Sequence, residues 1–574
     1  MKKFSDIKLL KNDHKLLVPT LIVFTVFAVY LNTMENSFHY DDYHSIVGNP
    51  YIRHLSNIPG FFKDASMFSS SPDMVMYRPV LLTSYVISYM LGGYEMWGWH
   101  LLNIIIHALN ALLFYYFSRR HMGRTVAFTM AVVFAVHPFC AEPVNYISSR
   151  SSLLAATFFI SSMLAYTCYF SSERKPFFAL SLLLFFAGML TKEPVIVLPG
   201  VLIFHDLLLS KADAEDATTR LVAFFKRILP FAVLAGVYIL IRRAFLLPTL
   251  PSSHIDRTVW ENLLVQSEVM SMYFKHFFIP VGYSGAYEFN VAGFSYGKMI
   301  GIVLISGLAV SAFIASRNMP LFSIGVLWFF LSILPETLWP LNLIAADRRM
   351  YLPFMGILIS IGALVDTILD AEDNLPTVAP GICAVFIVFS LAFLTVDRNR
   401  DWSSGLTFWA DAVSKCPESA VAYDSYGHYL ASNAEHERAL RAFRIAVYKN
   451  PNSSRANANL GITLAELGKY QDAVWYIKQS IEISRKLGTP NRARIKLGNI
   501  YYRMGHLKKA EAQLGIAVKE NPFVPIAHYD MARVFAAQLK TEQAEKHFRI
   551  AAELDPGFSG PVNEELKKLR AIKK

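Results

Sequence analysis

Residues 439–451, ALRAFRIAVYKNP, return in altered form as residues 473–485, AVWYIKQSIEISR, and this recurrence decides the fold of the C-terminal part of the chain. Its first alanine belongs to a set of four that are spaced 34, 37 and 34 residues apart: Ala439, Ala473, Ala510 and Ala544. Large apolar residues repeat the same spacing at Phe443, Ile477, Leu514 and Phe548. Such self-similarity predicts stacked helix pairs, an α-solenoid.

The length of the period identifies the kind of solenoid. A repeat of 34 residues is typical of tetratricopeptide (TPR) helix pairs. Gly427 and Gly461 also lie 34 residues apart, and a missing side chain there lets paired helices approach closely. The sequence therefore predicts a TPR domain of about four repeats over residues 401–574. The longer middle period indicates three extra residues in the connection at 486–491.

Upstream of about residue 400 the chain is a string of apolar segments separated by short polar loops, and 54% of its 574 residues are hydrophobic. A run of about 17–25 apolar residues can cross a bilayer as a helix. The sequence therefore predicts a many-pass membrane domain over residues 1–400 with about eleven spans. They are expected at 16–31, 97–117, 125–139, 152–170, 177–190, 195–209, 228–246, 299–315, 321–338, 350–368 and 378–396.

Charge in the loops predicts the orientation of these spans. The net charge is +11, and lysine and arginine gather in the N-terminal tail and in the loops at 119–124, 173–175 and 211–227. By the positive-inside rule these segments are cytoplasmic. The loops 32–79 and 247–298 and the TPR domain are then expected on the outer side of a plasma (inner) membrane. No nucleic-acid recognition motif accompanies the basic charge, so nucleic acid is not an expected partner.

Two adjacent carboxylates, Asp41 and Asp42, follow the first span. Neighbouring acids at a membrane boundary repel each other and are costly to desolvate, which suits a general base or a cation site. The alternative is structural, because aspartate also caps helices well. On spacing alone the structural role is favoured.

Polar side chains also lie within or beside the later spans. His100, Asn103 and His107 fall on one face of a helix. Ionisable groups inside a membrane are candidates for function, but Asn and His also form hydrogen bonds between helices. The spacing leaves both roles open. A second group of this kind comprises His137, Glu142 and Arg150.

Basic residues at the outer ends of helices point to an anionic ligand. Lys192, Arg348 and Arg349 lie on the side that the positive-inside rule disfavours for cations. Arg and Lys bind phosphate well, so a phosphate group is the favoured ligand. The chain has no Walker A loop and no HExxH motif, which argues against ATP-driven transport and zinc-peptidase chemistry.

Together these motifs resemble the transmembrane and TPR-containing O-mannosyltransferases and their bacterial relatives, members of the GT-C superfamily of glycosyltransferases. The resembling stretches are Tyr40-Asp41-Asp42 with Asn49, Tyr77-Arg78-Pro79, His100 to His107, His137 to Arg150, Thr191-Lys192-Glu193-Pro194, residues 273–287 and Ala346 to Pro353. The resemblance covers nearly the whole chain. It implies an all-α fold, a polytopic GT-C-type membrane domain followed by a TPR α-solenoid.

The resemblance also implies a reaction. A sugar moves from a polyprenyl-phosphate donor to an acceptor hydroxyl, with inversion, and Asp41 is the expected base while Asp42 orients the acceptor or a cation. The donor phosphate is expected at Arg78, Lys192, Arg348 and Arg349. The cavity is expected to be lined by Tyr40, His100, Asn103, His107, His137, Glu142, Arg150 and Glu193. A divalent cation, Mg²⁺ or Mn²⁺, would bind at Asp41 and Asp42 if the reaction uses one.

Three readings of the whole chain follow. In the first, the acceptor is a protein that docks on the TPR domain for O-glycosylation. In the second, the same fold ligates or polymerises larger glycans and needs a wider cavity. In the third, the chain is a membrane scaffold that uses only its TPR surface. Acidic and basic side chains converging at the outer helix ends would favour an enzyme over a scaffold.

Overall fold

The computed structural model describes residues 16–71, 74–209, 217–246, 257–291, 293–371, 378–488 and 493–572. Within these residues the secondary structure is helical, with no strand, so the predicted all-α class is confirmed. The chain forms two compact units, Met1–Phe408 and Trp409–Lys574, each described by itself below. The basic N-terminal tail lies outside the described residues.

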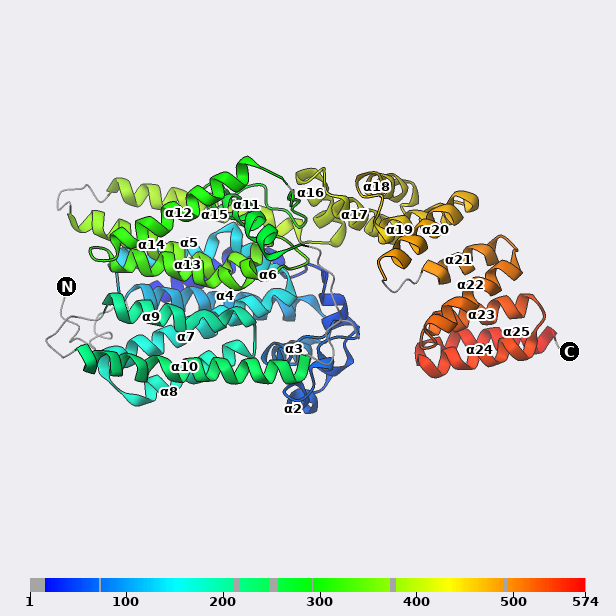
Figure 1. Cartoon of the computed structure of the whole chain (residues 1–574), viewed down its shortest axis with the longest axis horizontal. Helices are drawn as coiled ribbons and strands as arrows, with labels where there is room; N and C mark the ends of the chain where they lie inside the picture. Colours follow the sequence, from blue (N-terminus) through cyan, green and yellow to red (C-terminus); the bar gives the residue numbers. More distant parts are fainter. Residues whose placement is uncertain are drawn as a thin grey trace. The chain divides into compact units, whose positions relative to one another are not determined.

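The N-terminal unit is a bundle of long helices (Figure 1). They are α1 (Leu17–Tyr30), α3 (Pro79–Gly92), α4 (Met96–Ser118), α5 (Arg124–Val136), α7 (Arg150–Ser172), α8 (Lys175–Met189), α9 (Leu198–Leu209), α10 (Ala217–Leu246), α11 (Val259–Phe278), α12 (Tyr296–Ala315), α13 (Pro320–Leu338), α14 (Tyr351–Ala371) and α15 (Val378–Asp401). Every apolar segment expected to span the membrane forms a helix. Seven described helices are long and apolar enough to cross a bilayer, and an eighth would be α5 with the segment bent against it. The count of eleven spans stays a prediction.

One helix of this unit was not expected. Residues 257–291 fall within a stretch that the sequence indicates as an outer loop, yet α11 occupies much of it. Thr258 begins α11 with a capping box, in which its side chain accepts from the backbone N–H of Glu261 and the Glu261 carboxylate accepts from the backbone of Thr258. The buried face of α11 packs against α12 and α13. The helix therefore folds over the bundle instead of projecting from it.

Short turns between helices place the functional segments at one end of the bundle. α7 and α8, and α12 and α13, are joined by a few residues and run in opposite directions. The segments that follow α1, α5 and α13 therefore share one end, called here the site end. Trp97, Tyr296 and Trp339 are exposed near this end. Trp and Tyr favour membrane–water interfaces, so their position here fits a bilayer boundary.

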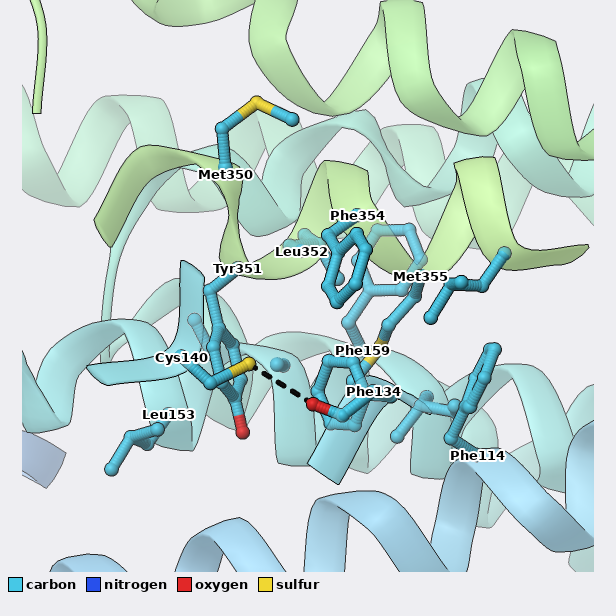
Figure 2. Close-up of a cluster of buried hydrophobic side chains, with 14 of the residues drawn as sticks. Phe114, Phe134, Cys140, Leu153, Phe159, Met350, Tyr351, Leu352, Phe354 and Met355 are labelled. Carbon is cyan, nitrogen blue, oxygen red and sulfur yellow. Dashed lines mark hydrogen bonds between the residues drawn. The ribbon is translucent and has the colours of Figure 1, made fainter. Parts of the chain in front are cut away.

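The core of the unit lies between α4, α5, α7 and α14. Aromatic side chains from these helices fill it, among them Phe114, Phe134, Phe159 and Phe354 (Figure 2). The ring of Phe134 is tilted against that of Phe114 and stacked on that of Phe354. All four are fully buried. Aromatic pairs of this kind contribute about 0.5–1.5 kcal/mol each beyond their buried area. The core thereby fixes the start of α14, which leads directly into the basic segment of the site.

Two facing glycines let α13 and α14 touch. A Cβ on Gly356 would lie 2.7 Å from the carbonyl oxygen of Gly325 and 2.8 Å from the backbone nitrogen of Phe329. Small residues at helix crossings allow such close packing in membranes. The contact is braced by the indole N–H of Trp328, which donates to the carbonyl oxygen of Leu352 over 3.1 Å.

The second unit contains four helix pairs with TPR spacing in the described residues. The pairs are α17 (Ala420–Ser432) with α18 (His436–Lys449), α19 (Ser454–Glu466) with α20 (Tyr470–Lys486), α21 (Ala493–Arg503) with α22 (Leu507–Glu520), and α23 (Pro525–Ala537) with α24 (Thr541–Leu554). The predicted TPR solenoid is confirmed. Gly461 explains the glycine of the repeat, since a Cβ there would lie 2.7 Å from the Ile477 side chain of the paired helix. The longer middle period lies partly in α20, which has 17 residues against 14 in α18.

We predict that Gly356→Ala destabilises the N-terminal unit, because the added methyl group meets backbone atoms of α13 that cannot rotate away. Overpacking of this kind costs about 1–3 kcal/mol. Gly307→Ala is the matched control, since a Cβ there meets nothing within 4 Å. Thermal unfolding of the two purified variants in detergent measures the difference. A midpoint for Gly356→Ala at or above that of Gly307→Ala would contradict the close crossing.

Candidate functional site

Asp42 anchors the segment that follows α1. Its side chain is fully buried. One carboxylate oxygen accepts from the backbone N–H of Ser148 over 2.8 Å and from its hydroxyl, and the other accepts from the backbone N–H of His39 over 3.0 Å. Burial raises the pKa of Asp42 to about 7, against the hydrogen bonds from Ser148 and His39, which lower it. Asp42 thus ties this segment to the turn at Ile147–Ser149.

Tyr40 turns the chain so that the two aspartates point in different directions. Its φ of +45° lies in the left-handed region, which a residue with a side chain rarely adopts. Such backbone strain is commonly held in place at functional sites. While Asp42 points inward, the side chain of Asp41 is 54% exposed. The adjacent carboxylates therefore have separate environments and separate roles.

Asp41 is held in its ionised form. Its carboxylate lies 3.4 Å from Nε2 of His44, and its backbone N–H donates to the phenol oxygen of Tyr146 over 3.1 Å. Partial burial tends to raise the pKa of Asp41, but hydrogen bonds from His44 and Tyr146 and the positive charge of Arg348 outweigh it and hold that pKa below its usual value. An ionised carboxylate that faces open space can accept a proton.

Asp41 lies at a pocket of about 60 Å³. Both aromatic and charged side chains line it. The aromatic residues are Tyr40, Tyr146, Trp402 and Phe408, and the charged ones are Asp41, Glu142, Arg348 and Arg398. Ser284 and Gly285 complete the lining beside small residues of the 343–346 segment.

The two neighbouring arginines at the start of α14 face different partners. Arg348 lines the pocket, pairs with Glu142 and lies 5.5 Å above the ring of Tyr146. Its backbone N–H donates to the other carboxylate oxygen of Glu142 over 2.9 Å. Arg349 instead donates to the carbonyl oxygens of Leu343 and Ile344. Arg348 is therefore the arginine that a ligand can reach, and Arg349 holds the 343–346 segment in place.

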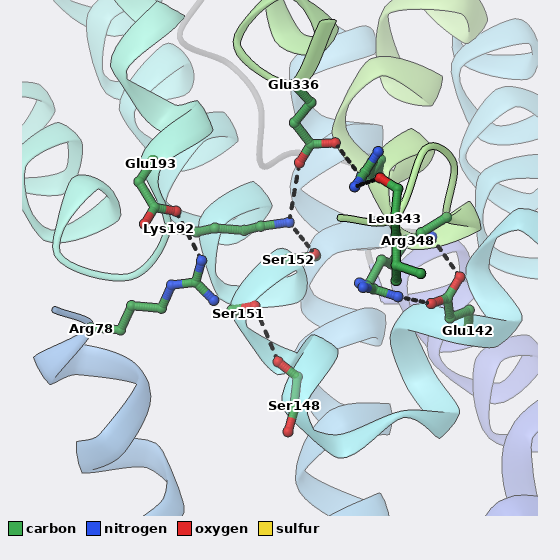
Figure 3. Close-up of polar contacts among 12 residues, drawn as sticks. Arg78, Glu142, Ser148, Ser151, Ser152, Lys192, Glu193, Glu336, Leu343 and Arg348 are labelled. Carbon is green, nitrogen blue, oxygen red and sulfur yellow. Dashed lines mark hydrogen bonds and ion pairs between the residues drawn. The ribbon is translucent and has the colours of Figure 1, made fainter. Parts of the chain in front are cut away.

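A second group of ion pairs lies beside Arg348 (Figure 3). Arg78 donates to Glu193 over 2.9 Å, and Arg242 of α10 reaches the same carboxylate at 3.4 Å. Lys192 lies 3.7 Å from Glu336 and donates to the hydroxyl of Ser152 over 3.0 Å. Lys192 interacts electrostatically with both Arg78 and Arg348. This second group and the pair of Arg348 with Glu142 therefore form one electrostatic site.

This site has a surplus of positive charge. Five cationic side chains share three glutamates, namely Arg78, Lys192, Arg242, Arg348 and Arg349 with Glu142, Glu193 and Glu336. Within these ion pairs the surplus amounts to two charges, of which the ionised Asp41 beside Arg348 offsets one. Guanidinium and ammonium groups clustered in this way bind phosphate, so an anionic ligand is the natural complement. Nε of Arg78 is buried and makes no hydrogen bond within the described residues.

Three of the residues expected in the cavity are packed inside the protein. Arg150 is fully buried and donates to Oδ1 of Asn103 over 2.7 Å, to the hydroxyl of Ser88 over 2.8 Å and to backbone carbonyls of α3 and α4. His100 bonds to the carbonyl oxygen of Asn36 over 2.8 Å. These side chains link α3, α4 and α7 and do not line the pocket.

Two further histidines are also internal. His107 bonds to the phenol oxygen of Tyr351 over 2.7 Å and to the carbonyl oxygen of Ala135 over 3.0 Å. His137 lies between the rings of Phe139 and Phe277. Neither lines the pocket that holds Asp41. Hydrogen bonding between helices, the alternative that the sequence left open for His107, describes that residue.

The structure adds residues that the sequence did not single out. Trp402 and Phe408 line the pocket but lie outside the membrane domain that the sequence predicted. Tyr146 also lines it, and as an uncharged residue it was not among the predicted site residues. The sequence could have indicated Glu336, because an ionisable residue at the end of an expected span is a candidate for function. Among the described residues, no group of three His, Cys, Asp or Glu side chains is placed to hold a metal ion.

Comparison with known proteins gives relatives that match most of the chain. A family model for the tetratricopeptide repeat matches residues 427–484 and 495–557. Protein O-mannosyl-transferase TMTC3 of Homo sapiens is 23% identical over 93% of this chain and 64% of its own length. Protein O-mannosyl-transferase F38B6.6 of Caenorhabditis elegans is 22% identical over 74% of this chain and 61% of its own length.

The homologues of this chain are TMTC O-mannosyl-transferases. The resemblance found in the sequence is thereby confirmed. TMTC2 of Mus musculus is 32% identical, over 25% of this chain and 18% of its own length. The chain spans less than two thirds of the length of the relatives it matches. A solved structure of MamA from Desulfovibrio magneticus covers 27% of the chain at a TM-score of 0.24, too low to carry an argument.

We predict that Arg150→Met destabilises the N-terminal unit by about 3 kcal/mol. The substitution leaves several buried acceptors unpaired, at about 1–3 kcal/mol each, which outweighs the relief of burying a charge. Arg119→Met, at an exposed position, is the control for loss of a cation. Thermal unfolding in detergent compares the two variants. Equal midpoints would show that the Arg150 network contributes little.

Proposed function

We propose that the chain is a membrane glycosyltransferase that moves a sugar from a polyprenyl-phosphate donor to a hydroxyl group of an acceptor protein. The observation that carries the proposal is that Asp41 and Arg348 line one pocket. A proton acceptor and a phosphate-binding cation are the two groups that such a transfer needs. The names of the relatives, protein O-mannosyl-transferases, support mannose as the sugar and a protein as the acceptor.

The donor phosphate binds among the surplus cations. Its charge replaces part of the pairing that Glu142 now gives Arg348, and Lys192 and Arg78 extend the positive surface beside it. The polyprenyl chain lies in the bilayer, where the apolar faces of the bundle meet lipid. Binding is selective for the transition state because the phosphate gains charge as it leaves.

The transfer is a single displacement. The acceptor oxygen attacks the anomeric carbon, and Asp41 takes the hydroxyl proton as the new bond forms. The bond between the anomeric carbon and the phosphate oxygen breaks, and its electron pair leaves with the phosphate, which gains one negative charge beside Arg348. One displacement without a covalent enzyme intermediate inverts the anomeric configuration. Asp42 does not touch the reacting atoms in this scheme, and it positions Asp41.

We propose the following orientation in the membrane. The N-terminus is cytoplasmic, the site end and the TPR domain are extracytoplasmic, and the membrane is the plasma (inner) membrane. The TPR domain docks the acceptor protein. Where the reaction uses Mg²⁺ or Mn²⁺, Asp41 is the aspartate whose carboxylate is accessible to it, because hydrogen bonds occupy both oxygens of Asp42.

The alternative of a membrane scaffold without enzyme activity does not account for the residues around the pocket. A scaffold has no need for an ionised carboxylate, a surplus of cations and a strained Tyr40 around one pocket. A glycan ligase or polymerase on the same fold acts on larger glycans, whereas the relatives are named protein O-mannosyl-transferases, a name that favours a protein acceptor. Transfer of one sugar to a protein is therefore the favoured reaction.

We predict that Asp41→Asn lowers the transfer of labelled mannose from polyprenyl-phosphate mannose by about 10²–10⁴-fold, the contribution of a general base. Asp42→Asn is expected to lower both activity and thermal stability, because an amide cannot accept all the hydrogen bonds that the carboxylate accepts. Asp64→Asn is the control, since Asp64 lies in the same outer segment and caps a turn at the surface. Full activity in Asp41→Asn with none in Asp42→Asn would reverse the two roles.

We predict that Tyr146→Phe moves the acid limb of the rate profile to higher pH. The hydrogen bond from Tyr146 favours the ionised carboxylate, so its loss raises the pKa of Asp41. The base is then protonated over a wider acid range, and the rate at pH 5 falls more than the rate at pH 8. The logarithm of kcat/KM against pH measures this shift. A parallel loss at every pH would assign Tyr146 to packing alone.

A further inference from the structure

The segment between α13 and the short turn at Asp347–Met350 has no regular structure of its own. Within the described residues, 340–345 form no backbone–backbone hydrogen bond, although the end of the segment, Ala345 and Ala346, is buried. Buried carbonyl oxygens need partners, so the backbone here must be held by side chains from elsewhere. Arg348 follows two residues after the segment ends, so the placement of this arginine depends on what holds it.

Polar side chains of α11 supply these partners. The amide of Gln266 donates to the carbonyl oxygen of Ile344 over 2.9 Å. The phenol of Tyr273 donates to the carbonyl oxygen of Ala346 over 2.9 Å and accepts from the backbone N–H of the same residue over 3.1 Å. One turn before Gln266, Asn262 donates to a carbonyl oxygen at the end of α13. All three side chains are buried, and their spacing of four and seven residues puts them on one face of α11.

The place of these bonds distinguishes them from ordinary packing contacts. Tyr273 binds both backbone groups of Ala346, and Tyr287 donates to the carboxylate of the next residue, Asp347, over 2.8 Å. The backbone N–H of Arg348 is held by a carboxylate of the site over 2.9 Å. Three successive residues are therefore fixed, each by a different partner, and the third is the arginine that lines the pocket.

Phosphate binding makes the position of this arginine important. A guanidinium group binds phosphate through two parallel N–H donors, and this geometry depends on direction. Misplacing a binding group by about 1 Å can cost about 10²-fold. Since Arg348 lies so close to Ala346 in the chain, the two bonds of Tyr273 limit how far the Cα of Arg348 can move. The Gln266 bond does the same one step further back along the segment.

We propose that Tyr273 and Gln266 are positioning residues, which place Arg348 for the donor phosphate through their bonds to the segment that precedes it. The inference rests on the proposed function and adds to it residues that do not themselves touch the donor. It also gives a role to the stretch 273–287, which the sequence singled out without one. In this role α11 is a rigid support for a segment that has no regular structure.

The test compares two buried phenols. Tyr273→Phe removes the bonds to Ala346, and Tyr283→Phe is the matched control, because Tyr283 is also buried but donates to the carbonyl oxygen of His276 over 3.0 Å. Binding of a fluorescent short-chain polyprenyl phosphate to the purified full chain is measured by polarisation. Tyr273→Phe should bind it roughly ten-fold more weakly than wild type, and Tyr283→Phe should bind it as wild type does.

Gln266→Met gives a second variant, which keeps the length of the side chain and removes its donor. It should weaken binding of the same phosphate in the same direction as Tyr273→Phe. Thermal unfolding in detergent accompanies each measurement. Tyr273→Phe and Tyr283→Phe each lose a buried hydrogen bond, so similar midpoints with different phosphate affinities would separate positioning from stability.

A double-mutant cycle shows whether Tyr273 acts through Arg348. Arg348→Met weakens phosphate binding by itself, and Tyr273→Phe added to it should cause no further loss, because the group that Tyr273 places is gone. Additive losses would overturn the positioning role. Wild-type binding by both Tyr273→Phe and Gln266→Met, together with mannose transfer by wild type, would also overturn it and leave the transferase intact. Absence of transfer by wild type, while Tyr273→Phe still weakens phosphate binding, would overturn the proposed function instead.

Discussion

Burying the carboxylate of Asp42 is costly, and hydrogen bonds from Ser148 and His39 offset that cost. The arrangement of the site depends on these bonds. They fix the segment after α1 against the turn before α7, and they hold Tyr40 in a backbone conformation that it would otherwise leave. Only with Tyr40 turned in this way does Asp41 face the pocket. The buried Asp42 thus determines the position of the accessible Asp41.

The cations of the site pose the opposite problem, because unpaired arginines close to a membrane would be unstable. Each one therefore pairs with a glutamate: Arg78 and Arg242 share Glu193, and Arg348 pairs with Glu142. Buried or half-buried ion pairs contribute little net stability, since desolvation offsets attraction. Their value here is that they keep cations charged and in place without fully neutralising them. The cations are therefore already in position when a phosphate binds, and binding does not have to order them.

Periodic and local patterns were readable from the sequence, and long-range contacts were not. The TPR repeats and the apolar helices follow from spacing and hydrophobicity. The spacing of Asp41 favoured a structural role, and only the family resemblance made it a candidate base, so the roles of Asp41 and Arg348 stay predictions. The buried Arg150 network could not be foreseen, because a buried arginine bonded to carbonyls looks the same in sequence as one that binds phosphate. Likewise α11 lay in a stretch whose hydropathy matches a loop, and packing on α12 decides its helix.

The end of α15 shows why the membrane unit extends past residue 400. Asn399 donates to the carbonyl oxygen of Val29 at the end of α1 and accepts from Asn145, which in turn accepts from Asn36. These amides join three segments that are distant in sequence at the level of the site. Trp402 follows three residues later and completes the pocket wall beside Asp41. A unit cut at residue 400 would keep every expected span and lose part of its site. The segment after α15, which carries Trp402 and Phe408, is therefore also a structural part of the pocket.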